Sequence, residues 1–128
     1  MKFVIIKERK NPPDKRAVLS PEACATLKKK FPSSNIKVES DTNRAFSDEE
    51  YRKFGIEVTN DISDCDVLLG IKEVPVEHLI PNKKYFFFSH TIKKQAHNQK
   101  LLQAILQKKI ELYDHEVITD TKGVRIVA

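Results

Sequence analysis

Two basic side chains each follow an apolar segment that is typical of a buried strand. Lys72 follows residues 66–71, and His90 follows the aromatic run at residues 85–88. Ligands of open parallel sheets bind beyond the carboxyl ends of the strands, so both side chains would face one crevice if these strands are neighbours. A lysine beside a second cation loses its proton more readily, and histidine titrates near neutrality. The pair would therefore suit acid/base chemistry on a carbonyl or an amine.

Ordinary structural roles compete with this interpretation. A Lys-Glu pair after a strand is usually a solvated turn, and a histidine after an aromatic run is often a satisfied strand-end residue. Arg16, in the loop between the first strand and the first helix, is a third candidate for the crevice, because a guanidinium can hold a carboxylate through two hydrogen bonds. The alternative for Arg16 is an ordinary surface arginine. Glu8 and Arg9, at the end of the first strand, are weaker candidates.

Short strands alternate with helices along the chain, and this order must position those side chains. We expect strands at residues 3–6, 36–39, 56–58, 66–71, 84–88 and 110–113, with one more at 124–127, and helices at residues 21–31, 48–55 and 96–108. Ser20 is placed to cap the first helix, and Ser47 with Glu50 forms a capping box for the second. The alternation predicts an α/β fold, an open and mostly parallel doubly wound sheet with helices on both faces, Rossmann-like or flavodoxin-like.

The three glycines limit what cofactor this chain can hold. Gly55, Gly70 and Gly123 are isolated from one another. A dinucleotide-binding turn needs clustered glycines, and a P-loop needs Gly and Lys at fixed offsets. Any nucleotide cofactor must therefore sit mainly on another domain, since 128 residues make one domain with a real core.

Charge and cysteine content exclude further classes of function. The 23 Lys and Arg residues are spread among 18 Asp and Glu, which argues against a nucleic-acid partner despite the net charge of +5. Cys24 and Cys65 are expected to be buried core thiols, and no Cys or His spacing suggests a metal site. No apolar run approaches the length of a membrane span or of a signal-peptide core, so we expect a cytoplasmic protein with no membrane partner.

Six segments, in order along the chain, resemble one known family. They are KERK at 7–10, KRAVLSP at 15–21, IKEVP at 71–75, FFSHTIKKQ at 87–95, LYDHE at 112–116 and GVRIVA at 123–128. Together they resemble the N-terminal domain of alanine dehydrogenase and pyridine nucleotide transhydrogenase. The fourth segment is most similar to lysine-forming saccharopine dehydrogenases, in particular the lysine–ketoglutarate reductase branch, because plain alanine dehydrogenases lack its lysine.

The resemblance implies a two-domain, NAD(P)-dependent oxidoreductase of which residues 1–128 are the N-terminal substrate domain. The nucleotide-binding domain would follow this segment, which fits a chain that stops inside an apolar run. By resemblance, Lys72 and His90 are the acid/base pair, Arg16 binds a substrate carboxylate, and Lys93 with Glu116 forms a charged pair near the keto-acid carboxylate. The implied reaction joins the ε-amine of lysine to 2-oxoglutarate as an imine, which NAD(P)H reduces to saccharopine.

Two alternatives remain open from the sequence. One is an alanine dehydrogenase that acts on pyruvate and ammonia, and the other is a non-catalytic amino-acid-binding module built on the same domain. Lys93 and Lys94 can also be two solvated lysines before a helix. The partners expected are small amino-acid and 2-oxo-acid substrates and, for the whole protein, further copies of itself in a homo-oligomer.

Overall fold

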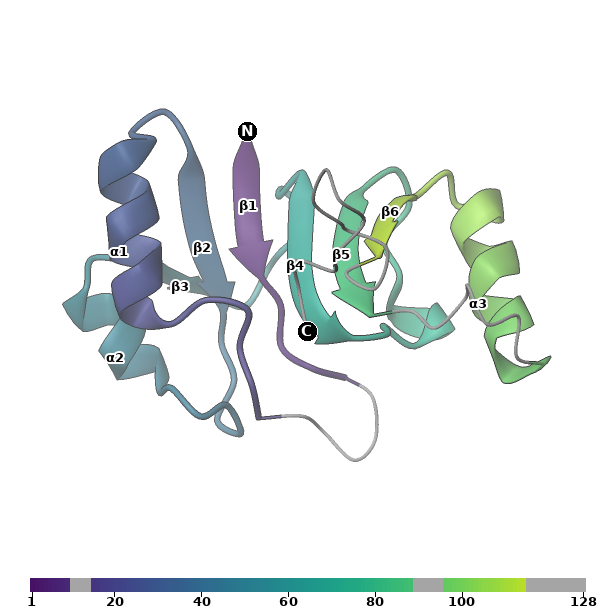
Figure 1. Ribbon diagram of the computed structural model, residues 1–128, viewed down its shortest axis with the longest axis horizontal. Helices are drawn as coiled ribbons and strands as arrows, with labels where there is room; N and C mark the ends of the chain where they lie inside the picture. The colour runs from purple at the N-terminus through teal and green to yellow at the C-terminus, as the bar shows by residue number, and fades with distance from the viewer. Residues whose placement is uncertain (10–14, 89–95, 115–128) are drawn as a thin grey trace, which may run out of the picture.

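The chain was studied as a computed structural model that describes residues 1–9, 15–88 and 96–114 (Figure 1). Three residues assigned to the site by resemblance, His90, Lys93 and Glu116, lie outside the described residues. The strand expected at 124–127 lies outside them as well.

The described part of the chain is built around a sheet of six strands. They are β1 (Lys2–Ile5), β2 (Asn35–Glu39), β3 (Glu57–Thr59), β4 (Val67–Lys72), β5 (Lys84–Phe88) and β6 (Glu111–Asp114), in the order β3-β2-β1-β4-β5-β6. Every neighbouring pair is parallel. All strand carboxyl ends therefore lie at one edge, the lower edge in Figure 1. The predicted open parallel α/β fold is confirmed.

Helices connect the strands where the sequence predicts them. They are α1 (Pro21–Lys30), α2 (Asp48–Lys53) and α3 (Ala96–Gln107), with a short 3₁₀ helix, η1 (Val76–His78), that the sequence pattern did not predict. The Ser20 hydroxyl oxygen accepts the N–H of Ala23 at 3.1 Å, and the Ser47 hydroxyl oxygen accepts the N–H of Glu50 at 3.2 Å. Both N-caps are thus formed, and each satisfies a donor that the first helical turn leaves open. Of the capping box predicted for Ser47 and Glu50, the structure shows the bond to the Ser47 side chain. No helix in the described ranges is long and apolar enough to cross a membrane.

The two faces of the sheet bury separate apolar clusters, because successive side chains of a strand point to opposite faces. Val4 lies in the cluster that contains Leu68, Tyr85 and Phe87 and that packs on α3 through Leu101, Ala104 and Ile105. Ile5 lies in the other cluster, which contains Ile36 and Val38 together with Cys24 of α1 and Tyr51 of α2. In Figure 1, α1 and α2 accordingly lie beside the β2–β3 half of the sheet and α3 beside the β5–β6 half.

Both cysteines are core residues, as the sequence predicted. Cys24 and Cys65 are buried free thiols, one in each apolar cluster. Burial raises the pKa of Cys24 to about 11 and also raises the pKa of Cys65. The neutral thiol is therefore the form present near neutral pH, which suits a packing role rather than nucleophilic chemistry.

Candidate active site

The order in which the chain adds strands to the sheet reverses between β1 and β4. From β1 the chain continues through α1 to β2 on one side, whereas β4 is the neighbour of β1 on the other side. Ligands of such sheets bind at the carboxyl edge where the order reverses. The residues at this point are Lys7, Glu8 and Arg9 after β1, Glu39 at the end of β2, and Lys72 at the end of β4.

A carboxylate continues the contact between β1 and β4 where the backbone ladder stops. The N–H of Ile6 donates to the carbonyl of Leu69 at 3.0 Å. Beyond that bond, the Glu8 carboxylate accepts the N–H of Ile71 at 3.1 Å on one oxygen and the N–H of Lys72 at 2.7 Å on the other. Glu8 therefore binds the backbone of the residue that the sequence named as a catalytic candidate.

The end of β4 departs from regular pairing at this place. Leu69 pairs with Phe86 of β5, but Lys72 rather than Ile71 pairs with Phe88, so β4 contains one extra residue. In a regular strand successive N–H groups point to opposite sides, whereas a bulge lets two neighbouring N–H groups point the same way. This irregularity explains how one carboxylate can accept both N–H groups. The extra residue also shifts Lys72 to the opposite face of the sheet from the one it would occupy in a regular strand.

Glycine at position 70 provides the space for this arrangement. A Cβ atom at Gly70 would lie 3.1 Å from Cδ1 of Ile6 and 3.4 Å from Oε2 of Glu8. The first distance is shorter than ordinary carbon contacts allow, and the second places the side chain directly against the Glu8 carboxylate. The glycine thus serves a close approach between β1 and β4, and not a nucleotide-binding turn.

A second carboxylate fixes the exit of the chain from β1 on its other side. Glu39 has a side chain only 5% exposed, and its Oε1 accepts the backbone N–H of Lys7 at 2.9 Å and Nη1 of Arg9 at 2.9 Å. Nη2 of Arg9 contacts the other carboxylate oxygen, which makes the pair bidentate. Such pairing compensates the cost of burying the charge, so Lys7 and Arg9 are held against the end of β2.

Arg44 also binds the end of β2. Its Nη2 donates to the backbone carbonyl of Glu39 at 2.7 Å, and its guanidinium lies 5.5 Å from the centre of the Tyr51 ring. Nη1 of Arg44 is 3.7 Å from the Asp48 carboxylate and makes no hydrogen bond to the part of the chain that the structure describes. Burial raises the pKa of Tyr51 to about 12, so its hydroxyl stays protonated and donates to the carbonyl of Leu19 at 2.8 Å.

The loop that contains Arg16 is anchored at both ends at the carboxyl edge. The N–H of Ala45 donates to the carbonyl of Lys15 at 2.8 Å, and Tyr51 holds Leu19 at the other end. Arg16 itself is an exposed residue between these two anchors. The loop joins β1 to α1, so Arg16 lies at the end of the sheet where β1 and β4 have their carboxyl ends, and its binding of a carboxylate stays a prediction.

The acid/base prediction requires that the strands preceding Lys72 and His90 are neighbours in the sheet, and they are. β4 and β5 are neighbours, and Lys72 is the last residue of β4. His90 follows β5 by two positions and lies outside the described residues, as do Lys93 and Glu116. The pairing of Lys72 with His90 and the role of the Lys93–Glu116 pair therefore stay predictions.

Sequence reasoning missed Glu39 and Arg44 and understated Glu8. Glu39 stands in the strand expected at residues 36–39, and it is not among the site residues expected from the sequence. The opposite charges of Arg9 and Glu39 at the ends of two consecutive strands were the available signal, because consecutive strands often pair. No comparable signal predicted Arg44, whose contacts depend on how the loop after β2 folds back.

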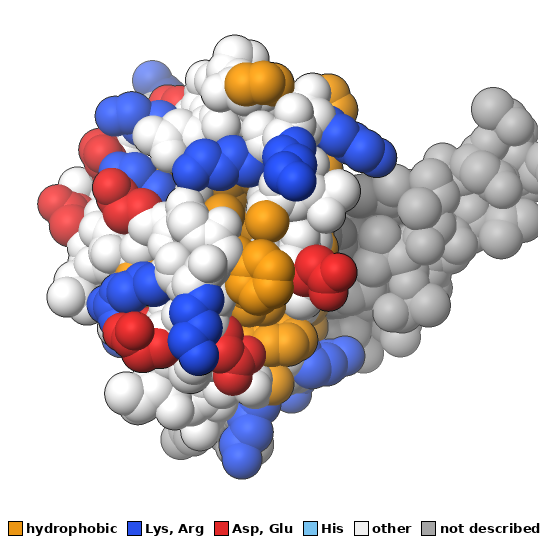
Figure 2. All heavy atoms as spheres, turned by 90° about the vertical axis from the view of Figure 1, so that its left-hand side faces the viewer, with side chains coloured by type: hydrophobic (Ala, Val, Ile, Leu, Met, Phe, Trp, Pro, Cys, Tyr) orange, Lys and Arg blue, Asp and Glu red, His pale blue; other side chains and the backbone are white. Residues whose placement is uncertain are grey.

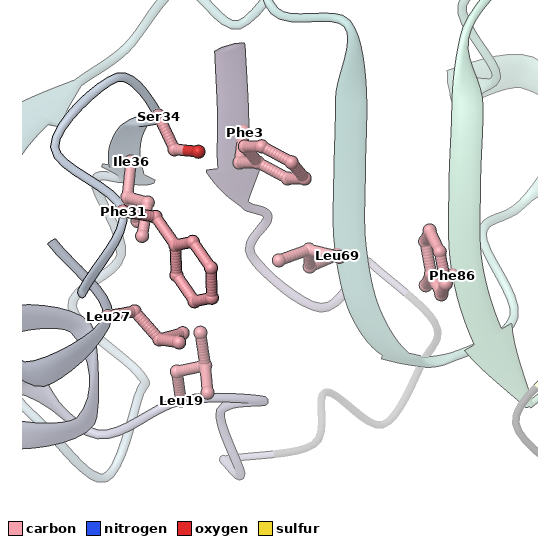
Figure 3. A pocket seen from close by; sticks show the side chains of 8 residues that line it. All are labelled: Phe3, Leu19, Leu27, Phe31, Ser34, Ile36, Leu69 and Phe86. Atoms are coloured by element: carbon pink, nitrogen blue, oxygen red, sulfur yellow. The ribbon is translucent and has the colours of Figure 1, made fainter. Parts of the chain in front are cut away.

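An apolar pocket of about 240 Å³ lies elsewhere, between α1 and the sheet (Figure 3). Phe3, Leu69 and Phe86 line it from the strands, and Leu27 and Phe31 approach from α1 and its end. Among the described residues that line it, Ser34 alone is polar. Carboxylate and amine substrates need charged partners, so this pocket does not suit them and the carboxyl edge remains the candidate site.

The surface on the side of α1 and α2 carries side chains of both charges. Basic and acidic side chains are interspersed around a central group of apolar side chains (Figure 2). This pattern differs from the single-sign stripe typical of nucleic-acid-binding faces. Within the described ranges, no group of three His, Cys, Asp or Glu side chains is placed to hold a metal ion.

The described residues do not fit a dinucleotide at the end of β1. Sheets with this strand order bind the pyrophosphate on a glycine-rich turn at the N-terminus of the following helix. Residues 6–20 contain no glycine, and the Glu8 carboxylate lies at the end of β1 where the phosphates would approach. The Ser20 side chain already binds the N–H of Ala23 in the first turn of α1. That a nucleotide is held mainly by another domain stays a prediction.

Comparison with known proteins decides the family. Residues 4–128 match the family described as alanine dehydrogenase/PNT, N-terminal domain. The chain belongs to this family. The match covers nearly all of the sequence, including the segments that suggested the resemblance.

Two curated relatives show which enzymes the chain is similar to. The chain is 38% identical over 128 residues to alpha-aminoadipic semialdehyde synthase of Arabidopsis thaliana, a match to 97% of this chain and 12% of that protein. It is 28% identical over 129 residues to the NAD(+)-dependent, L-lysine-forming saccharopine dehydrogenase of Emericella nidulans, with coverage of 96% and 34%. The chain thus spans about an eighth and about a third of the lengths of these relatives.

A solved structure shows the same fold. The chain of an L-alanine dehydrogenase superposes with a TM-score of 0.76 at 18% sequence identity, over 96% of this chain and 34% of that one. At this identity the likeness supports the α/β sheet with its helices and carries no statement about substrate.

Proposed function

We propose that this chain is the substrate domain of an NAD(P)-dependent amino-acid oxidoreductase, and that the whole enzyme is a lysine-forming saccharopine dehydrogenase or lysine–ketoglutarate reductase. The observation that carries the proposal is the 38% identity to alpha-aminoadipic semialdehyde synthase over 97% of this chain. The position of Lys72 at the carboxyl edge, where β1 and β4 meet, supports it from the geometry.

The proposed reaction forms and then reduces a carbon–nitrogen double bond. The ε-amine of lysine attacks the 2-oxo carbon of 2-oxoglutarate, and the adduct loses water to give an imine. The imine then takes a hydride and a proton to give saccharopine, while NAD(P)H becomes NAD(P)⁺. The family's nucleotide is assigned to a separate domain, because the described residues do not fit it.

Proton transfer is the contribution assigned to this chain. The attacking amine must lose a proton, and the hydroxyl of the adduct must gain one before it can depart as water. A general base that takes the first proton and a general acid that gives the second suit these steps. We assign them to Lys72 and His90, with Lys72 placed by β4 and the Glu8 carboxylate.

Positive charge at the same edge is proposed to select the substrates. Lysine contributes one carboxylate and 2-oxoglutarate contributes two, whereas pyruvate has only one. Arg16, on the anchored loop after β1, is assigned to a substrate carboxylate because a guanidinium binds it bidentately. Lys93 is assigned to the keto-acid carboxylate, with Glu116 as its charged partner.

A product assay with the full-length protein tests this proposal. The enzyme is supplied with NADPH or NADH and either lysine with 2-oxoglutarate or ammonia with pyruvate. We expect saccharopine to form at a kcat/KM at least about tenfold above that for alanine. In the Lys93→Ala variant, the KM for 2-oxoglutarate should rise while the KM for the nucleotide stays unchanged.

The same assay can overturn the proposal. A preference of the unmutated enzyme for pyruvate and ammonia would assign it to alanine dehydrogenase. Binding of an amino acid without nucleotide-dependent turnover in either mixture would favour a non-catalytic binding module.

A further inference from the structure

We infer that Glu8 is the positioning residue of the site, and that it acts by holding the bulged end of β4 and thereby orienting Lys72. The inference rests on the proposed function for the role of Lys72. It adds a residue to which neither the sequence motifs nor the comparisons assign a part in the reaction.

The contacts of Glu8 are directed at the backbone of the residue it would position. Its two carboxylate oxygens accept the N–H groups of Ile71 and Lys72 at 3.1 and 2.7 Å. The regular ladder between β1 and β4 ends with Ile6 and Leu69, two residues before these N–H groups. The Glu8 side chain thus takes the place of the backbone carbonyls that β1 no longer supplies.

Only a carboxylate meets both donors equally. It has acceptor lone pairs on both oxygens, whereas a glutamine amide offers one oxygen and turns an NH₂ group toward the other N–H. Charge-assisted hydrogen bonds to backbone N–H groups are also stronger than neutral ones. Replacement by glutamine is therefore expected to release one of the two N–H groups without changing the volume of the side chain.

The bulge makes the position of Lys72 sensitive to these bonds. The extra residue of β4 between Leu69 and Lys72 sets the face to which Lys72 belongs. Bulges re-aim side chains next to active sites, and their geometry depends on local contacts because the ladder is interrupted. Gly70 lets the Ile6 side chain approach this part of β4, since a Cβ there would lie only 3.1 Å from Cδ1 of Ile6.

A double-mutant cycle in the full-length protein tests the inference. Glu8→Gln is expected to lower kcat for lysine and 2-oxoglutarate by roughly 10- to 100-fold, because a small misplacement of a catalytic group has effects of that size. The KM for the nucleotide should not change. In a Lys72→Met background, the same Glu8→Gln change should alter kcat by less than about twofold, because it acts through Lys72.

A matched control separates positioning from loss of charge or fold. Glu22, an exposed glutamate in the first turn of α1, is changed to glutamine in the same two backgrounds and should leave kcat unaltered. If Glu8→Gln lowers kcat equally in the presence and absence of Lys72, Glu8 has a general structural role and the inference is wrong.

Hydrogen exchange gives a readout that does not depend on the substrate. In the full-length protein, the peptide that contains residues 70–73 should exchange its amide hydrogens faster in Glu8→Gln than in the unmutated protein, and Glu22→Gln should not change it. Unchanged protection in Glu8→Gln would overturn the inference even if saccharopine is the product. Faster exchange in an enzyme that makes no saccharopine would support the contact and reject only the proposed function.

Discussion

At the scale of single residues, carboxylates tie three strand ends together at the carboxyl edge. Glu39 connects the end of β2 to Lys7 and Arg9, and Glu8 connects the end of β1 to Ile71 and Lys72. Glu39 accepts one backbone N–H and the Arg9 guanidinium, and Glu8 accepts two backbone N–H groups. The ends of these strands are therefore held by side-chain hydrogen bonds as well as by the sheet.

The Arg9–Glu39 pair is expected to contribute strongly to stability. Arg9→Met leaves a carboxylate with a 5% exposed side chain without its bidentate partner. Loss of one partner of a buried pair costs about 3 kcal/mol in the free energy of unfolding. Denaturant unfolding of the variant measures this change.

The exposed pair between Lys2 and Asp64 provides the matched control. Its atoms are 3.5 Å apart, and both side chains are about half exposed, so Lys2→Met should cost less than about 1 kcal/mol. Equal effects of the two substitutions would contradict the structural role assigned to Glu39.

Cys24 should make stability fall at high pH. Its pKa is about 11 in the folded protein because of burial, compared with an ordinary value of 9.0. Between these two values the unfolded chain loses the thiol proton and the folded chain keeps it, so the unfolded state binds fewer protons and the free energy of unfolding decreases as pH rises. Below the ordinary value the contribution is fully present.

Unfolding curves recorded from pH 8 to about 11 check this dependence. In a Cys24→Ala variant the part of the slope that belongs to this thiol should disappear, although the variant is less stable at every pH because of the lost packing. A slope that is identical with and without Cys24 would show that its thiol does not titrate as described.

Hydrogen bonds between residues far apart in the chain set the limit of prediction from sequence. Lys72 and Arg16 were placed at the carboxyl edge because the order of strands and loops determines which edge a residue follows. The bonds from Ile71 and Lys72 to Glu8 join residues more than 60 positions apart. No local pattern in one sequence specifies such a pairing, so the role of Glu8 became visible only in the folded chain.

At the scale of elements, the helix starts were predictable because their signals are local. Ser20 precedes Pro21 and accepts the N–H of Ala23, and Ser47 accepts the N–H of Glu50. The bulge at the end of β4 and the 3₁₀ helix η1 were not predicted. Both depend on packing against neighbouring elements, which periodicity does not report.

The N-cap of α1 should have a measurable effect on stability. Ser20→Ala removes the acceptor for the N–H of Ala23 and is expected to lower the free energy of unfolding by about 1 kcal/mol. Ser33→Ala, at an exposed serine in the turn after α1, serves as the control and should change it by less than about 0.5 kcal/mol. If Ser20→Ala lowers the free energy of unfolding no more than Ser33→Ala does, the bond to Ala23 does not stabilise α1.

At the scale of the whole molecule, the order of the strands determines which residues meet at the carboxyl edge. β1 lies between β2 and β4, and the residues that follow β1 and β4 meet at one edge. The same order occurs in dinucleotide-binding sheets, but here a carboxylate lies at the end of β1 and residues 6–20 lack glycine. The fold alone would suggest nucleotide binding, whereas the residues at its functional edge argue against it.

Residues 1–128 alone are therefore expected to show no dehydrogenase activity. The isolated chain is assayed with lysine, 2-oxoglutarate and NADPH or NADH, and the full-length protein is the positive control. Consumption of the nucleotide above background by the isolated chain would contradict the assignment of the cofactor to another domain.

The central claim is that the edge between β1 and β4 is the catalytic site and that Lys72 performs proton transfer there. The most direct test is kcat of the full-length enzyme carrying Lys72→Met, compared with Lys53→Met, which changes an exposed lysine at the end of α2. We predict that Lys72→Met lowers kcat by roughly 10²–10⁴-fold while its melting temperature stays close to that of the unmutated enzyme. Lys53→Met should change neither quantity. Near-normal turnover of Lys72→Met, with Lys53→Met equally active, would contradict the claim.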